Sequence, residues 1–475
     1  MSKECPEGWA VSPLGNLVEV LDGRRVPINS NERAKRAGSV PYFGATGQVG
    51  WIDDHLFDEE LVLVGEDGAP FLDKSKAIAY LIDGKSWVNN HAHVLRARAT
   101  TSNIFVKYAL DATKFDEFVN GTTRLKLTQG AMVTIPIPVP PLAEQHRIIE
   151  KVEFLFEQVK PAKDRLDRVS RMLKRFRQAV LSAACSGELT RQWRKAHRYQ
   201  AKARVVAPDD DLPPLPELPE EWSLAPLNEA VERFQYGTSE KADADERTGV
   251  PVVRMGNIQD GRLDLSDLKF IKKSSALDEF FVRPGDVLFN RTNSPELVGK
   301  TAVADPDRPM VFASYLIRAQ AKPRIVRPEF VSWWLNSAWG RLWARHVRAD
   351  GVSQSNINAS KLAAMPVPLP SLDEQDEALR VGGQVLALAD AIERRVQAAR
   401  TRAEKLPQAI LLRAFSGELV PTEAELARAE GRSYETADEL LARVRVNDGR
   451  GDDDTSGIRR AVRANAAGPQ KHRRA

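Results

Sequence analysis

The sequence has few cysteines, no long apolar run and no strong excess of charge. Its 475 residues include two cysteines, Cys5 and Cys185, too few for a disulfide framework or a cysteine-based metal cluster. No stretch of 18 apolar residues occurs, and the first residues lack the apolar core of an export signal. We therefore expect a cytoplasmic protein without a membrane span. The composition, 28% charged and 42% hydrophobic, is typical of globular domains, and the length predicts about three of them.

The formal net charge is only +4, but two segments have a clear excess of positive charge. Residues 446–475 hold seven Lys and Arg against four Asp and lack periodic apolar residues, which predicts a disordered basic tail. Residues 163–198 hold eleven Lys and Arg against three acidic residues. We expect this basic block either to border a DNA channel or to bind an acidic partner. The large remaining segments are close to neutral, so charge alone is weak evidence for nucleic-acid binding.

Motifs that would indicate catalysis are incomplete. The segment 294–301 resembles a phosphate-binding loop, but it lacks the first glycine and precedes a β-type run instead of a helix. His91 and His93 share one face of a predicted strand without a third metal ligand nearby, which favours a hydrogen-bonded pair. Glu66 and Asp67 lie between two glycines and are predicted to occupy a turn. The sequence therefore predicts a non-catalytic chain that binds no metal or cofactor itself.

One set of motifs occurs twice. The stretch IPIPVPPLAEQ, which ends at Gln145, returns as MPVPLPSLDEQ, which ends at Gln375, a shift of 230 residues. The same shift maps QAVLSAACSGEL at 178–189 onto QAILLRAFSGEL at 408–419. Nearer the N-terminus, PEGWAVSPL at 6–14 matches PEEWSLAPL at 219–227 with a shift of 213. The intervening sequences share little, and the second is 17 residues longer, which indicates one frame that carries two different inserts.

Each repeat ends in a long helical pattern. Apolar residues alternate at spacings of four and three, as in the seam of a coiled coil, and equal length favours antiparallel pairing over two unrelated helices. Pro161 and Pro407 are expected to kink the helices, and Gly187 and Gly417 to cap them. The predicted helix-pairing residues are Ile148, Val152, Leu155, Val159, Leu166, Val169, Leu173, Phe176 and Val180 in the first helix, and Val385, Ile392, Val396, Leu406 and Ile410 in the second.

Short β-type runs alternate with turns between the repeated motifs, with one helical segment in each insert, at 103–119 and at 328–347. We predict an α+β protein with two pseudo-repeated globular heads, each of mixed α and β structure, joined by two long antiparallel coiled-coil helices. The expected boundaries are 1–142 for the first head, 143–190 for the first helix, 191–218 for a proline-rich and basic linker, 219–372 for the second head, 373–420 for the second helix, 421–445 for a short C-terminal helical segment and 446–475 for the tail.

This order of motifs resembles the specificity subunit of type I restriction-modification systems, over residues 6–445. The resemblance implies a non-catalytic subunit with two target-recognition domains, each reading half of a split site in double-stranded DNA through the major groove. It implies that the helices set the gap and dock two DNA methyltransferase subunits, and that a restriction and translocase subunit joins the complex. S-adenosylmethionine, ATP and magnesium would bind those partners. The specificity subunit of a type IIB system, a coiled-coil scaffold whose heads bind proteins, and a DNA hydrolase with an unrecognised site remain alternatives.

Basic and amide residues in the loops of the heads are candidates for DNA contacts, because they can donate to phosphates and base edges. In the first head these are Arg24, Arg25, Arg33, Lys35, Arg36, Arg124 and Lys126, and in the second Arg254, Asn257, Arg291, Asn293, Arg348 and Gln354. The first helix is predicted to span roughly 65 Å. Its length would act as a ruler that fixes the gap between two half-sites about one DNA turn apart, roughly 34 Å.

Overall fold

The computed structural model describes residues 5–73, 75–197, 211–351 and 354–447. The predicted basic tail lies almost entirely outside the described residues. The chain divides into two compact units, residues 1–166 with 398–475 (unit 1) and residues 167–397 (unit 2). The units therefore differ from the two sequence repeats, because unit 1 combines the first head with the end of the second long helix. Across the described residues, no helix is long and apolar enough to cross a membrane.

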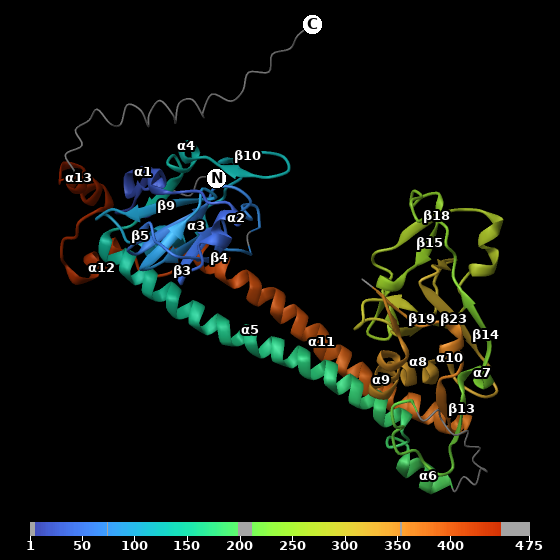
Figure 1. The fold of residues 1–475 in the computed structure, drawn as a ribbon. Helices are drawn as coiled ribbons and strands as arrows, with labels where there is room; N and C mark the ends of the chain where they lie inside the picture. The colour runs from blue at the N-terminus through green and yellow to red at the C-terminus, as the bar shows by residue number, and fades with distance from the viewer. Residues whose placement is uncertain (1–4, 74, 198–210, 352–353, 448–475) are drawn as a thin grey trace. The chain divides into compact units, whose positions relative to one another are not determined.

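The two long helices are α5 (Leu142–Cys185) and α11 (Leu372–Ala414), and each contributes one half to each unit. In unit 1, Ile148 and Val152 near the start of α5 cluster with Leu411 and Ala414 at the end of α11. In unit 2, Arg177 in the second half of α5 pairs with acidic residues in the first half of α11. The helices are thus antiparallel in both units (Figure 1). Both remain helical through Pro161 and Pro407.

The contact face of the helices differs from the predicted seam at three positions. Phe176 is 44% exposed, Ile392 38% and Leu406 44%. Instead, the side chain of Arg177 is 16% exposed and lies 2.6 Å from carboxylate oxygens of both Asp390 and Glu393. A straight helix has 3.6 residues per turn and drifts about 20° per heptad from a strict seven-residue repeat, so a seam extrapolated over five heptads leaves the contact face.

The first head, in unit 1, is built from two sheets and small helices. One sheet has the strand order β2-β9-β6-β7 and the other β4-β3-β8-β5, and α3 packs on β6 and β7. The elements are β1 (Ala10–Pro13), α1 (Leu14–Leu17), β2 (Val18–Val20), α2 (Ser30–Lys35), β3 (Val40–Gly44), β4 (Gly47–Ile52), β5 (Phe57–Asp58), β6 (Leu61–Gly65), β7 (Ala79–Ile82), β8 (Lys85–Val88), β9 (Ala92–Ala97), α3 (Asn103–Ala112), β10 (Val119–Asn120), β11 (Lys126–Leu127), α4 (Gln129–Met132) and β12 (Pro136–Val139).

The second head, in unit 2, repeats this plan, which confirms the α+β prediction. Its main sheet has the order β14-β23-β19-β21, and a second sheet has the order β18-β15-β22. The elements of this part are α6 (Arg191–His197), β13 (Ser223–Pro226), α7 (Leu227–Ala230), β14 (Val231–Tyr236), β15 (Gly249–Val253), β16 (Ile258–Gln259), β17 (Arg262–Leu263), β18 (Lys269–Lys272), β19 (Asp286–Asn290), β20 (Thr292–Asn293), β21 (Thr301–Val303), β22 (Val311–Phe312), β23 (Leu316–Ala321), α8 (Pro328–Asn336), α9 (Ala338–Val347), β24 (Ala349–Asp350), β25 (Ser355–Asn356), α10 (Ala359–Ala363) and β26 (Pro366–Leu369).

The helical segment predicted at 328–347 is two helices, α8 and α9. They separate at Ser337, whose backbone is extended and whose hydroxyl accepts a hydrogen bond from the backbone N–H of Gly340. A serine in this role satisfies a free N–H at a helix start, so it begins a new helix where the apolar pattern alone predicts continuity.

The repeated proline runs form strands that pair with the strand after each tryptophan. β12 pairs antiparallel with β1, and β26 pairs in the same way with β13. Each pair is a two-stranded sheet, so every strand is an edge strand, where proline is tolerated because its missing N–H can face away from the partner. The alternating prolines thus tie the end of each head to its beginning.

The repeated SGEL motif docks on the tryptophan motif of the opposite repeat. Gly417 has a φ of +73°, and a Cβ atom there would lie 2.5 Å from Pro6. Gly187 has a φ of +78°, and its Cβ would lie 2.6 Å from Pro219. Only glycine combines this backbone conformation with so close an approach, so both glycines end a helix and seat a head.

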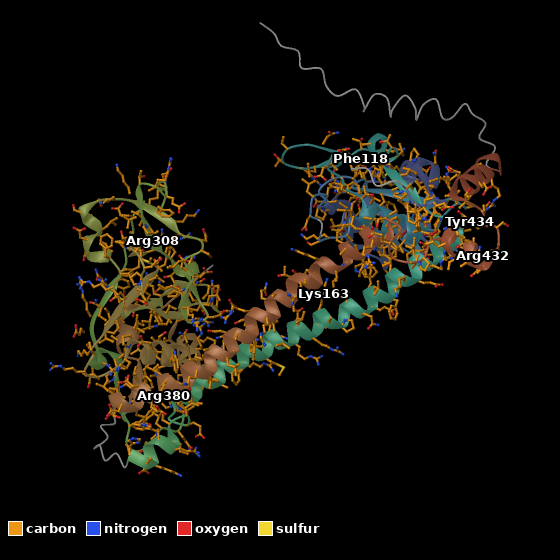
Figure 2. The ribbon with its side chains drawn as sticks, turned by 180° about the vertical axis from the view of Figure 1, so that it is seen from behind. Phe118, Lys163, Arg308, Arg380, Arg432 and Tyr434 are labelled. Atoms are coloured by element: carbon orange, nitrogen blue, oxygen red, sulfur yellow. The ribbon has the colours of Figure 1, made fainter. Side chains whose placement is uncertain are left out.

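The C-terminal segment packs on the first head within unit 1. It contains α12 (Glu423–Glu430) and α13 (Ala437–Asn447), and Ala437 and Leu441 join the core of the head. Tyr434 lies against Gly8, and Arg432 pairs with Glu423 at 2.6 Å (Figure 2). This segment therefore completes the core of unit 1.

Candidate nucleic-acid interface

The main sheets of the two heads match strand for strand. β6 and β19 each have five residues, all buried, and β9 and β23 each have six. Gly65 at the end of β6 pairs with Ala92, and Asn290 at the end of β19 pairs with Leu316. The shift between the heads is 225 residues for β6 and 224 for β9, between the values of 213 and 230 seen in the flanking motifs. Candidate residues can therefore be compared position by position.

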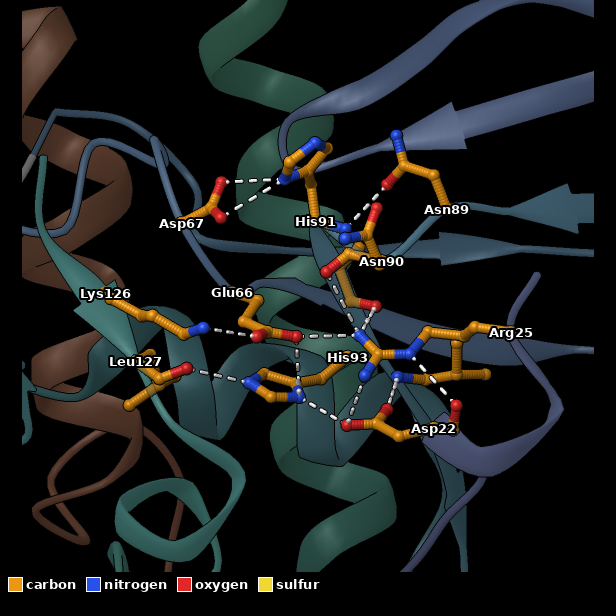
Figure 3. A network of polar contacts seen from close by, with 12 residues as sticks. Asp22, Arg25, Glu66, Asp67, Asn89, Asn90, His91, His93, Lys126 and Leu127 are labelled. Carbon is orange, nitrogen blue, oxygen red and sulfur yellow. Dashed lines mark hydrogen bonds and ion pairs between the residues drawn. The ribbon is translucent and has the colours of Figure 1, made fainter. Parts of the chain in front are cut away.

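A network of charged side chains surrounds the end of β6 (Figure 3). Nη1 of Arg25 lies 2.8 Å from Oε2 of Glu66, and Nζ of Lys126 lies 3.0 Å from Oε1 of the same carboxylate. Burial raises the pKa of Glu66, but the hydrogen bonds from Arg25 and Lys126 and the charge of His93 outweigh it, so this pKa lies below its usual value. Glu66 is therefore held as a carboxylate between two cations.

His93 is 1% exposed, and both of its ring nitrogens face oxygen atoms. Nδ1 lies 2.6 Å from Oδ2 of Asp22, and Nε2 lies 2.9 Å from the carbonyl oxygen of Leu127. The nearby His91 is 41% exposed in its side chain, and its Nδ1 lies 2.9 Å from Asp67. The two histidines are thus hydrogen-bonded to carboxylates.

Asp22, Glu66 and His93 bring their donor atoms within 4.8 Å of one another, which is close enough to hold a metal ion. However, the guanidinium of Arg25 lies within ion-pair distance of both Asp22 and Glu66. The carbonyl of Leu127 faces the second nitrogen of His93. A cation in this group would be repelled by Arg25, so these residues fit an ion-pair network better than a metal centre.

Three other arginines among the candidates in the first head lie over aromatic rings. The guanidinium carbons of Arg24, Arg33 and Arg36 lie 4.6–4.7 Å from the ring centroids of Phe57, Tyr42 and Trp87, respectively. Arg36 also pairs with Asp53 at 2.7 Å. These contacts give the arginines a packing role. Lys35, on the last turn of α2, is exposed.

Two candidates in the second head hold a turn together. The Asn257 side chain is bonded to the backbone N–H of Arg254 and to the carbonyl oxygens of Asp264 and Asp267. Asn257 is 3% exposed, so its side chain is occupied by the turn and cannot reach DNA without breaking it. The sequence makes Asn257 a candidate for a DNA contact, but a buried amide must satisfy its own hydrogen bonds first, and here those bonds stabilise the turn.

A polar hollow of about 530 Å³ opens beside this turn. Its lining includes Arg254, Asn293, Lys300 and Tyr315. Burial lowers the pKa of Lys300, and the cations of Arg341 and Lys174 lower it further, although Asp260 opposes them. The sequence analysis did not select Lys300 or Tyr315. Tyr315, 45% exposed beside predicted candidates, offers no pattern by which the sequence could identify it.

The remaining candidates of the second head lie around the hairpin of β24 and β25. Arg291 lies over the ring of Tyr236 and donates to Oδ1 of Asn356 at 3.1 Å. Arg348 pairs with Asp350 at 2.7 Å, and Gln354 is exposed. Asn356 is a polar residue that the sequence analysis missed, although it stands 230 positions after Lys126, the shift of the flanking motifs.

The segment that resembles a phosphate-binding loop is a turn between β20 and β21, as predicted. Gly299 has a φ of +84°, and the strand β21 begins at Thr301 instead of a helix. The guanidinium of Arg341 donates to the carbonyl oxygens of Glu296 and Val298 and fills the turn. The backbone N–H groups are therefore not arranged as a phosphate cradle.

The described part of the basic block, residues 163–197, lies on the second part of α5, on the turn after it and on α6. Lys163 projects from α5 (Figure 2), and Lys174 and Arg177 line a cavity of about 340 Å³ beside the second head. Lys300 and Arg341 line the same cavity, together with Asp260 and Glu296. The block thus contributes cations to a pocket of mixed charge.

Comparison with known proteins finds a matching family model and several curated relatives. The family model of the type I restriction modification DNA specificity domain matches residues 6–170. The type I restriction enzyme EcoBI specificity subunit of Escherichia coli is 34% identical over 288 residues, which cover 60% of this chain and 58% of that subunit. The EcoKI specificity subunit of Escherichia coli strain K12 is 27% identical over 442 residues, 88% of this chain and 90% of that one.

A solved structure shares the fold. It comes from work on complex assembly and conformational transition of the type I R-M system, and it covers 88% of this chain and all of its own, with a TM-score of 0.58 at 20% identity. The solved structure shows the fold alone, whereas residues 6–170 match a DNA specificity domain. The chain is thus similar to the specificity subunits of type I restriction-modification systems.

Proposed function

We propose that this chain is the DNA sequence-recognition subunit of a type I restriction-modification complex and has no catalytic site of its own. Each head reads one half of a bipartite site in double-stranded DNA, and α5 and α11 set the gap between the halves. The helices dock two DNA methyltransferase subunits, and a restriction and translocase subunit completes the complex. S-adenosylmethionine, ATP and magnesium bind these partners, and the complex acts on DNA in the cytoplasm.

The observation that carries this proposal is one scaffold used twice with different surface chemistry. The strands, the proline pairs and the tryptophan contacts repeat between the heads, whereas the side chains at the strand ends do not. A scaffold protein whose heads bind two copies of one partner would be expected to carry the same side chains on both heads. Two heads that read different base sequences require different donors and acceptors on equal frames.

Partner docking is supported by apolar side chains on the outer faces of the helices. Phe154, Met172 and Leu388 are 53%, 60% and 62% exposed, respectively. Exposed apolar residues of this size along long helices are typical of surfaces that are covered in a complex.

The test is to express the chain with its methyltransferase subunit and map methylated adenines across a genome by long-read sequencing. Two short defined sequences around a fixed gap are the expected result. Methylation at a continuous motif would contradict two spaced reading heads. A stable complex that methylates nothing would favour a scaffold, and cleavage by the isolated chain with magnesium would favour a hydrolase. Cleavage on both sides of the bipartite site by the full complex would identify a type IIB system.

A further inference from the structure

A hairpin follows the main sheet at the same place in each head. In the first head, β10 and β11 pair antiparallel, and the backbone N–H of Leu127 donates to the carbonyl oxygen of Glu66 at 2.8 Å. In the second head, β24 and β25 pair antiparallel, and the N–H of Ile357 donates to the carbonyl oxygen of Arg291 at 2.9 Å. Each hairpin is therefore bonded to the residue that directly follows the matching strand, β6 or β19.

The next residue along each strand end also pairs with the hairpin. Asp67 is the bridge partner of Lys126, and Thr292 is the partner of Asn356. Lys126 and Asn356 are related by the shift of 230 residues that relates the flanking motifs. The backbone thus places residues 126 and 356 at equivalent positions, and residues 124 and 354 by the same shift.

A glycine directly follows the first strand of each hairpin, Gly121 after β10 and Gly351 after β24. A Cβ atom on Gly121 would lie 2.4 Å from the carbonyl oxygen of Arg124, and the φ of Gly121 is +115°. The N–H of Gly351 donates to the carbonyl oxygen of Gln354 at 2.9 Å. Each glycine therefore lies close to the carbonyl oxygen of the residue three positions later, Arg124 or Gln354. The registers of the two hairpins differ, because Asn120 pairs with Lys126 whereas Asp350 pairs with Ser355.

The side chains on this shared frame differ in chemistry. Arg124 and Lys126 are 61% and 52% exposed and pair with Asp67 and Glu66 at the strand end. Gln354 in the second head is exposed, and Asn356 lies beside Arg291. The exposed ion pair of Arg124 adds little to stability, so the fold does not require an arginine there.

We infer that the end of β6 or β19 and the hairpin strand bonded to it, β11 or β25, form the base-reading element of each head, and that residues 124 and 354 are its specificity-determining residues. The inference rests on the proposed function. Arginine donates to the O6 and N7 atoms of guanine, whereas glutamine pairs with the N6 and N7 atoms of adenine. The element therefore reads a G·C pair in the first half-site and an A·T pair in the second.

The test uses reciprocal exchange in the complex with the methyltransferase. Arg124→Gln is expected to change one base pair of the first half-site, with roughly 5- to 150-fold less methylation at the original sequence, and to leave the second half unchanged. Gln354→Arg is expected to change only the second half. Lys114→Ala, an exposed cation after α3 of the same head, is the control and should leave the motif unchanged.

The outcomes separate this inference from the proposed function. If both exchanges methylate the original motif at the original rate, the element does not read bases, although the bipartite motif still stands. Uniform loss at every sequence with an unchanged unfolding temperature would indicate a phosphate contact and would also overturn the inference. If Arg124→Gln fails to fold, Lys126→Asn and Asn356→Lys test in the same way whether the element reads bases. A wild-type complex without a bipartite motif would instead contradict the proposed function.

Discussion

Trp222 donates its indole N–H to Oε2 of Glu374 at 3.0 Å, across 152 residues of the chain. Trp9 and Glu144 make the same bond at 3.0 Å in unit 1, across 135 residues. Each carboxylate lies in the first turn of a long helix, and each indole precedes the first strand of a head. The bond therefore closes each head onto the helix that follows it, whatever the length of the insert.

The Glu374→Ala variant is expected to lower the free energy of unfolding of unit 2 by about 3 kcal/mol. Glu374 is 1% exposed and also accepts hydrogen bonds from Thr190 and Arg194, so its removal leaves the buried donors of Trp222 and Thr190, and the half-buried Arg194, without this acceptor. Urea unfolding monitored by tryptophan fluorescence measures the change. Asp373→Ala, the exposed neighbour, is the control. Equal stability of the two variants would show that the buried carboxylate contributes nothing specific.

The Glu66→Gln variant is expected to show a pH-dependent loss of stability. The pKa of Glu66 in the folded protein lies below the usual 4.5, because the hydrogen bonds from Arg25 and Lys126 outweigh the effect of burial. A carboxylate with a lowered pKa stabilises the fold above its unfolded pKa, and this contribution disappears as the pH falls through the folded pKa.

At pH 7, Glu66→Gln should therefore be less stable than the wild type by about 1–2 kcal/mol. The difference should shrink as the pH falls below about 4.5. Asp22 and His93 are present in both proteins, so the comparison isolates Glu66. Urea titrations at pH 7 and at pH 4 measure the difference. Glu117→Gln, an exposed carboxyl of the same head, should show little change at either pH, and a constant deficit for Glu66→Gln would exclude the charge-based explanation.

Leu173 and Phe176 distinguish the observed contact face from the seam predicted by heptads. Leu173 is 7% exposed and Phe176 is 44% exposed. Leu173→Ala is expected to cost about 2–4 kcal/mol of unfolding free energy, because it leaves a cavity, whereas Phe176→Ala should cost less than about 1 kcal/mol. Thermal unfolding of the purified chain compares the two. A larger loss for Phe176 would restore the seam predicted from the sequence.

The architecture could be predicted from the repeats, because the repeated residues are the ones whose backbone or burial requirements the fold depends on. Prolines in edge strands, a glycine with positive φ at each helix end and a buried Trp–Glu pair allow little substitution. The long helices followed from apolar periodicity. The sequence could not show which segments form each compact unit, because the contact between Gly417 and Pro6 joins segments from the two ends of the chain.

The candidate site was harder to predict, because a loop arginine does not reveal its partner. Arg25 is 14% exposed and neutralises Asp22 and Glu66, and Asn257 closes a turn. The equivalence of Arg124 and Gln354 depends on the backbone, because the shift between the heads changes along the inserts. The bonds of Leu127 and Ile357 and the pairings of Lys126 and Asn356 show that the 230-residue shift of the flanking motifs also holds here.

Under the proposed function, the lengths of α5 and α11 set the gap between the half-sites. Because the helices are antiparallel in both units, both must be lengthened together. A heptad inserted after residue 166 in α5 and another after residue 397 in α11 adds about 10 Å and rotates the helix by only about 20°. One base pair rises about 3.4 Å, so the methylated motif should keep both half-sequences and gain about three base pairs of gap.

Genome-wide mapping of methylated adenines in the complex reads out both the half-sequences and the gap. A heptad inserted in α5 alone is the matched control, and it should lower methylation at every site because the two helices no longer align. An unchanged gap in the doubly lengthened protein would refute the ruler, since the helices would then hold the heads without fixing their spacing on DNA. Altered half-sequences would instead mean that the helices themselves contact bases.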